Sequence, residues 1–216
     1  MTDVYLVRHA QTSGNKTRTF QGRTDADITE EGASQLKYLA ERFKNISFDK
    51  IYSSPLQRAR KTAQAVNLYH NKELVLEEGI IEIDVGKLEG IPFAELYQLY
   101  PEDVQVFINT PHLFKSPGGE SMMQVYERMV TTLGRLVGEN KGSRIVVVTH
   151  GCALQNYLAY ALGYGQEGIQ RAPICLNTAV THLRFTENGL PFVVALNDAS
   201  HLSAEQLEQG KWELKP

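Results

Sequence analysis

Two histidines stand out because each follows a run of apolar residues that is typical of a β-strand, and each precedes a very small residue. His9 is followed by Ala10, and His150 is followed by Gly151. In open sheets covered by helices, ligands bind at the carboxyl ends of the strands, so two such histidines can face one crevice. A neutral imidazole can attack an electrophilic atom such as phosphorus, and the small neighbours leave room for a ligand.

Two arginines could add positive charge to the same crevice. Arg8 precedes His9, and Arg58 lies in the first turn of a helix that Ser54, followed by a proline, predicts as its N-cap. A cation in a first helical turn opposes the helix dipole at a cost of about 0.3–1 kcal/mol, so its position favours an anion held nearby. Arginine forks match phosphate oxygens. Together with His150, these residues predict a cationic pocket for a phosphate group.

Alternating strand-like and helix-like segments predict the scaffold that must position these residues. The expected strands are Asp3–Val7, Asp49–Ser53, Leu74–Leu76, Arg144–Thr149, Ala179–Phe185 and Phe192–Leu196. The first two expected helices run from the N-cap Thr29 to about Phe43 and from Ser54 to about Tyr69. One or two short helices are expected within residues 92–109. The last two run from Met122 past Leu136 and from Gly151 to about Leu162. The last two strands predict a hairpin, and the run 144–149, which does not alternate, predicts a central strand covered on both faces. This order is typical of an α/β fold with a mostly parallel sheet.

Composition limits the kind of protein. The chain has 216 residues, 42% of them hydrophobic, which is enough for a packed core. Its 22 basic and 25 acidic residues give a formal charge of −3, so we expect no nucleic-acid or membrane-surface partner. Two cysteines, no signal-peptide pattern at the N-terminus and no apolar run near the roughly 20 residues of a membrane span predict a cytoplasmic protein with reduced thiols.

A series of ordered motifs spans about Val4 to Leu202. In chain order they are Arg8-His9-Ala10-Gln11-Thr12 with Asn15, Gln21-Gly22 with Asp25–Gly32, Ser53-Ser54-Pro55 with Arg58, Ala59 and Thr62, Glu82–Gly86 with Leu88-Glu89-Gly90, Pro117–Ser121, and Val147–Gly151. This series resembles the histidine phosphatase, or phosphoglycerate mutase-like, superfamily. The resemblance implies a three-layer α/β sandwich with helices on both faces of the sheet. It also implies a single domain over residues 1–216, in which about 88–120 forms a substrate-capping insertion.

The resemblance also implies a role for each matching residue. His9 would be the nucleophile that becomes phosphohistidine, and Glu82 would be the general acid and then the general base. His150 would act with them in catalysis. The residues implied to bind the phosphate group are Arg8, Asn15, Gln21, Gly22, Arg58 and Gly151. No metal or other cofactor is implied, so the charge of the transition state would be stabilised by the arginines and His150.

Some features leave alternatives open. Asp84 and Glu89 are rival candidates for the general acid, because both lie in the same motif as Glu82. Ala10 stands where the family usually has glycine, and Leu88 stands where many members have tryptophan. One added methyl at Ala10 should change the chemistry little, whereas Leu88 could alter the wall of the pocket.

The family includes both phosphatases and cofactor-dependent mutases. A phosphoglycerate mutase must hold a substrate with a carboxylate and a phosphate, yet residues 88–120 contain no arginine, one lysine (Lys115) and five aromatic side chains. This composition favours a phosphatase that acts on a small phosphorylated metabolite with little other charge. The mutase stays as the alternative, and a phospho-ligand-binding module without turnover as a remote one. The oligomeric state is left open, with a homodimer as one option.

Overall fold

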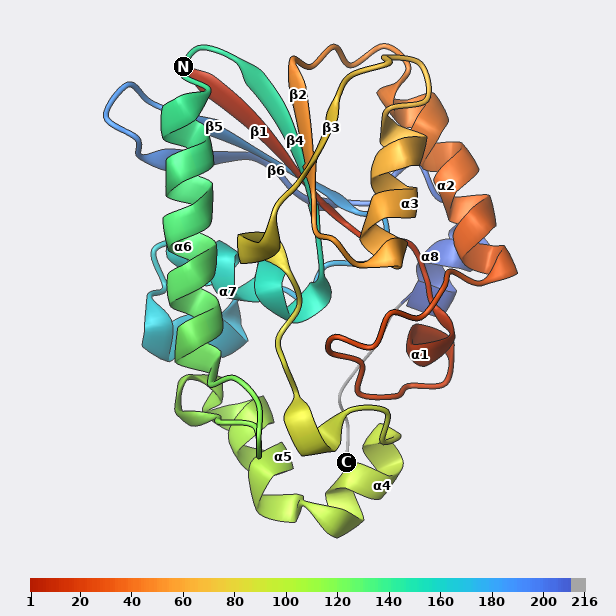
Figure 1. Cartoon of the computed structure of the whole chain (residues 1–216), viewed down its shortest axis with the longest axis vertical. Coiled ribbons are helices and arrows are strands. Elements are labelled where there is room, and N and C mark those ends of the chain that lie inside the picture. Colours follow the sequence, from red (N-terminus) through yellow and green to blue (C-terminus); the bar gives the residue numbers. More distant parts are fainter. Residues whose placement is uncertain (211–216) are drawn as a thin grey trace.

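A six-stranded sheet forms the centre of the computed structural model, which describes residues 1–210 (Figure 1). Its strands are β1 (Thr2–Arg8), β2 (Lys50–Ser53), β3 (Leu74–Leu76), β4 (Arg144–Thr149), β5 (Val180–Phe185) and β6 (Pro191–Asp198). They lie in the order β3-β2-β4-β1-β5-β6, parallel from β3 to β1 and antiparallel where β5 pairs with β1 and β6. The six predicted strands, the mostly parallel sheet and the terminal hairpin are confirmed.

Helices cover both faces of this sheet. The α-helices are α1 (Ser13–Lys16), α2 (Glu30–Phe43), α3 (Gln57–Val66), α4 (Phe93–Leu99), α5 (Pro101–Asn109), α6 (Met122–Glu139), α7 (Gly151–Ala161) and α8 (Ala204–Gly210), and the 3₁₀ helices η1 to η4 are Glu78–Ile80, Gly86–Leu88, Pro111–Leu113 and Gln166–Arg171. In Figure 1, α2 and α3 lie on one face of the sheet, and α6 and α7 lie on the other. The fold is therefore the expected three-layer α/β sandwich.

The strand β4 shows why its sequence does not alternate between apolar and polar residues. Ile145 and Val147 belong to the core that includes residues of α6 and α7, whereas Val146 and Val148 belong to the core that includes residues of α2 and α3. All four side chains are fully buried. Both faces of a central strand need apolar side chains when helices cover both, as the sequence predicted.

The start of α3 differs from the prediction. The helix begins at Gln57 rather than just after Ser54, and the carboxylate of Asp25 accepts a 2.6 Å hydrogen bond from the Gln57 N–H. The Ser54 hydroxyl lies 2.7 Å from Nε2 of His150 instead. The prediction of Ser54 as the cap was wrong, because the helix begins three residues later; the Ser54 hydroxyl accepts a 3.4 Å hydrogen bond from the Leu56 N–H ahead of the helix and shares its contacts with His150, which is distant in sequence. Arg58 still lies in the first turn of α3.

The segment 88–120 lies beyond the carboxyl ends of the parallel strands, where α4 and α5 form the lower part of Figure 1. Aromatic rings attach this segment to the loop after β1. The ring centroids of Phe20 and Phe93 are 5.0 Å apart, as are those of Phe20 and Phe107, and Phe107 contacts Phe114 at 5.1 Å. Such aromatic pairs contribute about 0.5–1.5 kcal/mol each beyond the burial of their area.

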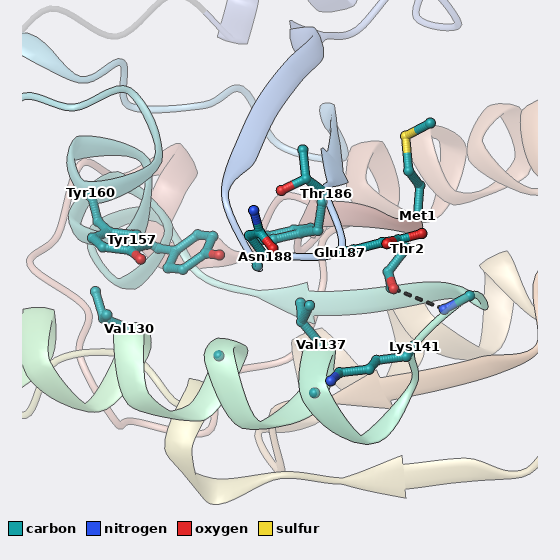
Figure 2. A pocket seen from close by; sticks show the side chains of 15 residues that line it. Met1, Thr2, Val130, Val137, Lys141, Tyr157, Tyr160, Thr186, Glu187 and Asn188 are labelled. Carbon is teal, nitrogen blue, oxygen red and sulfur yellow. Dashed lines mark hydrogen bonds between the residues drawn. The ribbon is translucent and has the colours of Figure 1, made fainter.

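A cavity of about 520 Å³ lies between α6, α7 and the hairpin of β5 and β6 (Figure 2). Its lining includes Val130 and Val137 of α6 and Tyr157 and Tyr160 of α7. None of the predicted site residues lines it, so its size does not indicate where the chemistry occurs. Among residues 1–210, no helix has both the length and the apolar character needed to cross a membrane.

Candidate active site

The nucleophile predicted at position 9 directly follows β1 and is almost completely buried, with 3% of its surface exposed. Its Nδ1 lies 2.7 Å from the carbonyl oxygen of Ala10. Because a carbonyl oxygen can only accept, Nδ1 holds the proton and Nε2 keeps its lone pair. Burial, followed by the charges of Arg58 and Arg8, lowers the pKa of His9 well below its usual value of 6.5. His9 is therefore a neutral imidazole with a nucleophilic nitrogen at neutral pH.

The strand pairing brings the second histidine beside the first. β1 and β4 are parallel neighbours, and the His9 N–H donates a 3.0 Å hydrogen bond to the carbonyl of Thr149, the residue before His150. The two rings are 5.1 Å apart between centroids. Burial, followed by the charge of Arg58, lowers the pKa of His150 well below 6.5. The two histidines therefore share one site, although they are far apart in the sequence.

Arg58 extends from α3 into the same site and is 1% exposed. Its Nε donates to Nδ1 of His150 at 3.2 Å, so the proton of that ring lies on Nε2, which faces Ser54. Nη1 and Nη2 donate 2.7 Å hydrogen bonds to the carbonyls of Thr24 and Gly22. Burial lowers the pKa of Arg58 to about 10, which leaves the guanidinium charged at neutral pH. This buried cation is fixed by the loop after β1.

Arg8 approaches the start of α7. Its Nη1 donates to the carbonyl of Cys175 at 2.5 Å, and its buried Nε finds no hydrogen-bond partner among the described residues. A Cβ built on Gly151 would come within 3.3 Å of Cζ and Nε of this guanidinium. A side chain at position 151 would therefore crowd Arg8. A buried arginine nitrogen without a partner, beside a helix N-terminus, is suited to an anion.

Glu82 faces the N-terminus of α7. Its carboxylate accepts hydrogen bonds from the N–H groups of Cys152 at 3.0 Å, Ala153 at 2.9 Å and Ile83 at 2.9 Å. The side chain is 6% exposed, and it lines the same cavity as His9. A helix N-terminus attracts a carboxylate through its free N–H groups and its dipole, so Glu82 is held in one orientation.

The two rival carboxylates lie elsewhere. Glu89 accepts from the backbone N–H groups of residues 22–24, and Asp84 accepts from Gly86 N–H while lying 3.8 Å from a guanidinium nitrogen of Arg23. Neither lines the cavity that contains His9. The geometry therefore favours Glu82 among the three predicted candidates.

A cavity of about 70 Å³ joins most of the remaining predicted residues. Its lining consists of Arg8, His9, Asn15, Thr19, Phe20, Gln21, Glu82, Phe93, Phe107, Gly151, Cys152, Gln155 and Ile174. Asn15 accepts from Thr12 and Asn177 through its Oδ1, and Gln21 accepts from Thr12 through its Oε1. Gly22 does not line the cavity, since its carbonyl contacts Arg58 and its N–H contacts Glu89. Arg58 and His150 are not among the residues that line the cavity, and they contact each other.

Several positioning contacts were missed by sequence reasoning. The Arg128 guanidinium of α6 donates to the carbonyl of Ile81 at 2.6 Å and pairs with both carboxylate oxygens of Glu120, at 3.0 and 3.2 Å. Asn177 donates to the carbonyl of His9 at 2.8 Å. A pairing of Arg128 with the Pro117–Ser121 motif could have been sought, because Glu120 is its only acidic residue. Nothing local in the sequence marks Asn177.

Within residues 1–210, no group of three or more histidine, cysteine or acidic side chains is arranged to hold a metal ion. Cys152 lines the cavity, but burial and the neighbouring carboxylate of Glu82 raise its pKa well above the usual value, which keeps the thiol protonated.

Comparison with known proteins agrees with this geometry. A model of the histidine phosphatase superfamily (branch 1) matches residues 4–199. The chain is 36% identical over 163 residues to phosphoserine phosphatase 1 of Hydrogenobacter thermophilus, covering 76% of this chain and 77% of that one. It is 32% identical over 203 residues to phosphoglycerate mutase-like protein 4 of Arabidopsis thaliana, covering 93% and 86%. A mutant of phosphoserine phosphatase from Entamoeba histolytica, solved with phosphoserine, superposes with a TM-score of 0.83 at 31% identity, covering 94% and 100%.

The family match extends over most of the chain, and two of these relatives exceed 30% identity over more than nine-tenths of it. The fold, with its mostly parallel sheet and helices on both faces, agrees with that of the solved relative. The chain is therefore a phosphatase-type hydrolase that belongs to branch 1 of the histidine phosphatase superfamily.

Proposed function

We propose that this protein hydrolyses small phosphomonoesters through a phosphohistidine on His9. The observation that supports this most strongly is the hydrogen bond from Nδ1 of His9 to the Ala10 carbonyl, which leaves Nε2 unprotonated in a site that holds the positive charges of Arg8 and the buried Arg58. In the first step, Nε2 forms a bond to phosphorus while the ester P–O bond breaks. Arg8 and Arg58 offset the charge of the phosphoryl oxygens.

Glu82 moves the protons in this mechanism. As the general acid of the first step, Glu82 has to be protonated when the phosphomonoester is bound. Glu82 then gives its proton to the leaving alkoxide, and in the second step it takes a proton from water as the water oxygen attacks phosphorus. The P–N bond breaks, His9 is regenerated and inorganic phosphate leaves. His150 would contact a phosphoryl oxygen through its Nε2–H, which then replaces the contact with Ser54.

The segment 88–120 is proposed as the cap that selects the leaving group. The lining of the cavity includes the aromatic residues Phe20, Phe93 and Phe107. Arg8 is the only arginine or lysine among the described residues that line the cavity. We therefore propose substrates whose alcohol part bears little additional negative charge.

The names of the relatives suggest two specific kinds of substrate. Two of the relatives named above are phosphoserine phosphatases, and one of them was solved with phosphoserine. The carboxylate of phosphoserine is accompanied by an ammonium group, so its alcohol part has no net charge. A relative named as mutase-like supports interconversion of phosphoglycerates as the second candidate. A mutase would need a second cation for the substrate carboxylate, and the single arginine of the lining disfavours it.

A panel assay separates these functions. Phosphate release is measured with phosphoserine, sugar phosphates, nucleoside monophosphates and an aryl phosphate, alongside the interconversion of 2- and 3-phosphoglycerate, with His9→Ala as the control. We expect phosphate release that persists with EDTA and is lost in His9→Ala. Fast interconversion with negligible phosphate release would show a mutase, and absence of both, with retained binding of phosphomonoesters, would show a binding module.

A further inference from the structure

Glu89 accepts hydrogen bonds from three consecutive backbone amides. Oε1 accepts from the N–H of Gly22 at 2.9 Å and of Thr24 at 3.3 Å, and Oε2 accepts from the N–H of Arg23 at 3.0 Å. Successive N–H groups that point to one side of the chain form a concave site for an anion, and here a side-chain carboxylate fills it. Within the described residues, Glu89 forms no ion pair, so the backbone of 22–24 is what its carboxylate binds.

The other side of the same loop holds Arg58. The carbonyls of Gly22 and Thr24 accept from Nη2 and Nη1 of Arg58, both at 2.7 Å. The two carbonyls that fix the arginine thus belong to residues whose N–H groups are fixed by Glu89. A buried guanidinium needs such partners, because an unpaired buried charge is strongly unfavourable. The loop therefore connects the carboxylate to the arginine.

The loop has little freedom to adopt another position. A Cβ on Gly22 would lie 2.5 Å from the carbonyl oxygen of Ile83 and 2.8 Å from Oε2 of Glu89. Only glycine lets the backbone approach both of these groups so closely. The N–H groups of 22–24 consequently stay on the carboxylate, and the carbonyls stay directed at Arg58.

We infer that Glu89 is a positioning residue, whose carboxylate orders the backbone of residues 22–24 so that its carbonyls hold Arg58 against His150. This inference rests on the proposed function, in which Arg58 stabilises the phosphoryl group. Glu89 does not face the cavity and transfers no proton. Its effect on the reaction passes through the loop to the guanidinium.

A double-mutant cycle tests this inference. Glu89→Gln in the otherwise unchanged protein should lower kcat/KM about 10- to 100-fold, the loss typical when a group that orients a functional side chain is removed. In the Arg58→Ala background the same change should add little, because the side chain that Glu89 positions is already absent. Independent, multiplying losses in the double variant would overturn the inference, as would unchanged activity in Glu89→Gln.

Further measurements separate positioning from a general loss of structure. In Glu89→Gln, the fall of kcat/KM at acidic pH should begin at a higher pH, because a displaced Arg58 lowers the pKa of His9 less. Partial unfolding would lower the activity without shifting this acid limb of the pH profile. Glu127→Gln in α6 removes the same charge from an exposed position outside the cap and should leave both readouts unchanged. If Glu89→Gln does not fold, Gly22→Ala disturbs the same contact and enters the same cycle. Full activity in Arg58→Ala alone would instead contradict the proposed function.

Discussion

At the scale of single residues, the site depends on where two protons lie. The Ala10 carbonyl fixes the proton of His9 on Nδ1, and Nε of Arg58 fixes that of His150 on Nε2. Both rings are neutral, because burial and the neighbouring arginines lower the pKa of each well below 6.5. A neutral His9 can attack phosphorus, whereas a protonated imidazole has no lone pair to offer.

The acid limb of the pH profile follows from this arrangement. Activity requires neutral His9, whose lowered pKa extends its neutral form to more acidic solutions, so kcat/KM should stay high to below about pH 6.5, the ordinary histidine value. Arg58→Ala removes one cause of the lowered pKa and should shift this limb to higher pH, besides lowering kcat/KM about 10²- to 10³-fold. A limb that stays in place in this variant would show that Arg58 does not act on His9.

Glu82→Gln tests the transfer of the proton to the leaving group. We expect alkyl phosphates, whose alkoxides are poor leaving groups, to lose about 10²- to 10⁴-fold in kcat, and an aryl phosphate to lose much less in the formation of phosphohistidine. Rapid-mixing measurements of that first step with both kinds of substrate provide the comparison. Equal losses would exclude Glu82 as the general acid.

At the scale of elements, the N-terminus of α7 brings the phosphate pocket and the acid together. Gly151 leaves room for Arg8, and the next two N–H groups bind Glu82. Most elements could be predicted from the sequence, because β4, α2 and α6 have apolar spacing that matches their burial. The start of α3 could not be predicted, since its capping carboxylate comes from Asp25 in a distant loop.

Gly151→Ala tests the room at the start of α7. The added Cβ lies 3.3 Å from Cζ of Arg8, closer than ordinary contact, so the guanidinium has to shift by a few tenths of an ångström. We expect roughly 10-fold lower kcat/KM and weaker inhibition by vanadate, since small misplacements of binding groups are costly. The matched control is Gly134→Ala in α6, where nothing lies within 4 Å, and it should keep full activity and gain about 0.5–1 kcal/mol in free energy of unfolding. Equal activity of the two variants would contradict this role of Gly151.

At the scale of the whole molecule, residues from separate parts of the chain converge on one cavity. The histidines could be predicted to meet, because both end neighbouring parallel strands. The positions of Glu82, Asn177 and Arg128 could not be derived from local pattern, because their partners are distant backbone groups. The resemblance to a family identified Glu82, and only the fold shows its contact with α7.

The buried histidines also predict how stability depends on pH. Burial lowers the pKa of His9 and His150 well below 6.5, and it lowers the pKa of His201 to about 4. These three side chains therefore stay neutral in the folded protein over a pH range where they bind protons in the unfolded chain. As the pH falls, these histidines take up protons in the unfolded chain before they do so in the folded protein. The free energy of unfolding should therefore fall as the pH drops below about 6.5. Chemical denaturation at neutral and mildly acidic pH measures this, and His201→Phe should weaken the dependence. Stability that rises on acidification would contradict the neutral state of these side chains.

The central claim is that the phosphoryl group passes through His9, and trapping the intermediate tests it most directly. The protein is mixed rapidly with a radiolabelled phosphomonoester that it hydrolyses, quenched in alkali, and digested to locate the label. We predict label that is stable to alkali and labile to acid, located on His9 and formed at least as fast as turnover. Turnover without such label, or label on another residue at the rate of turnover, would contradict the mechanism.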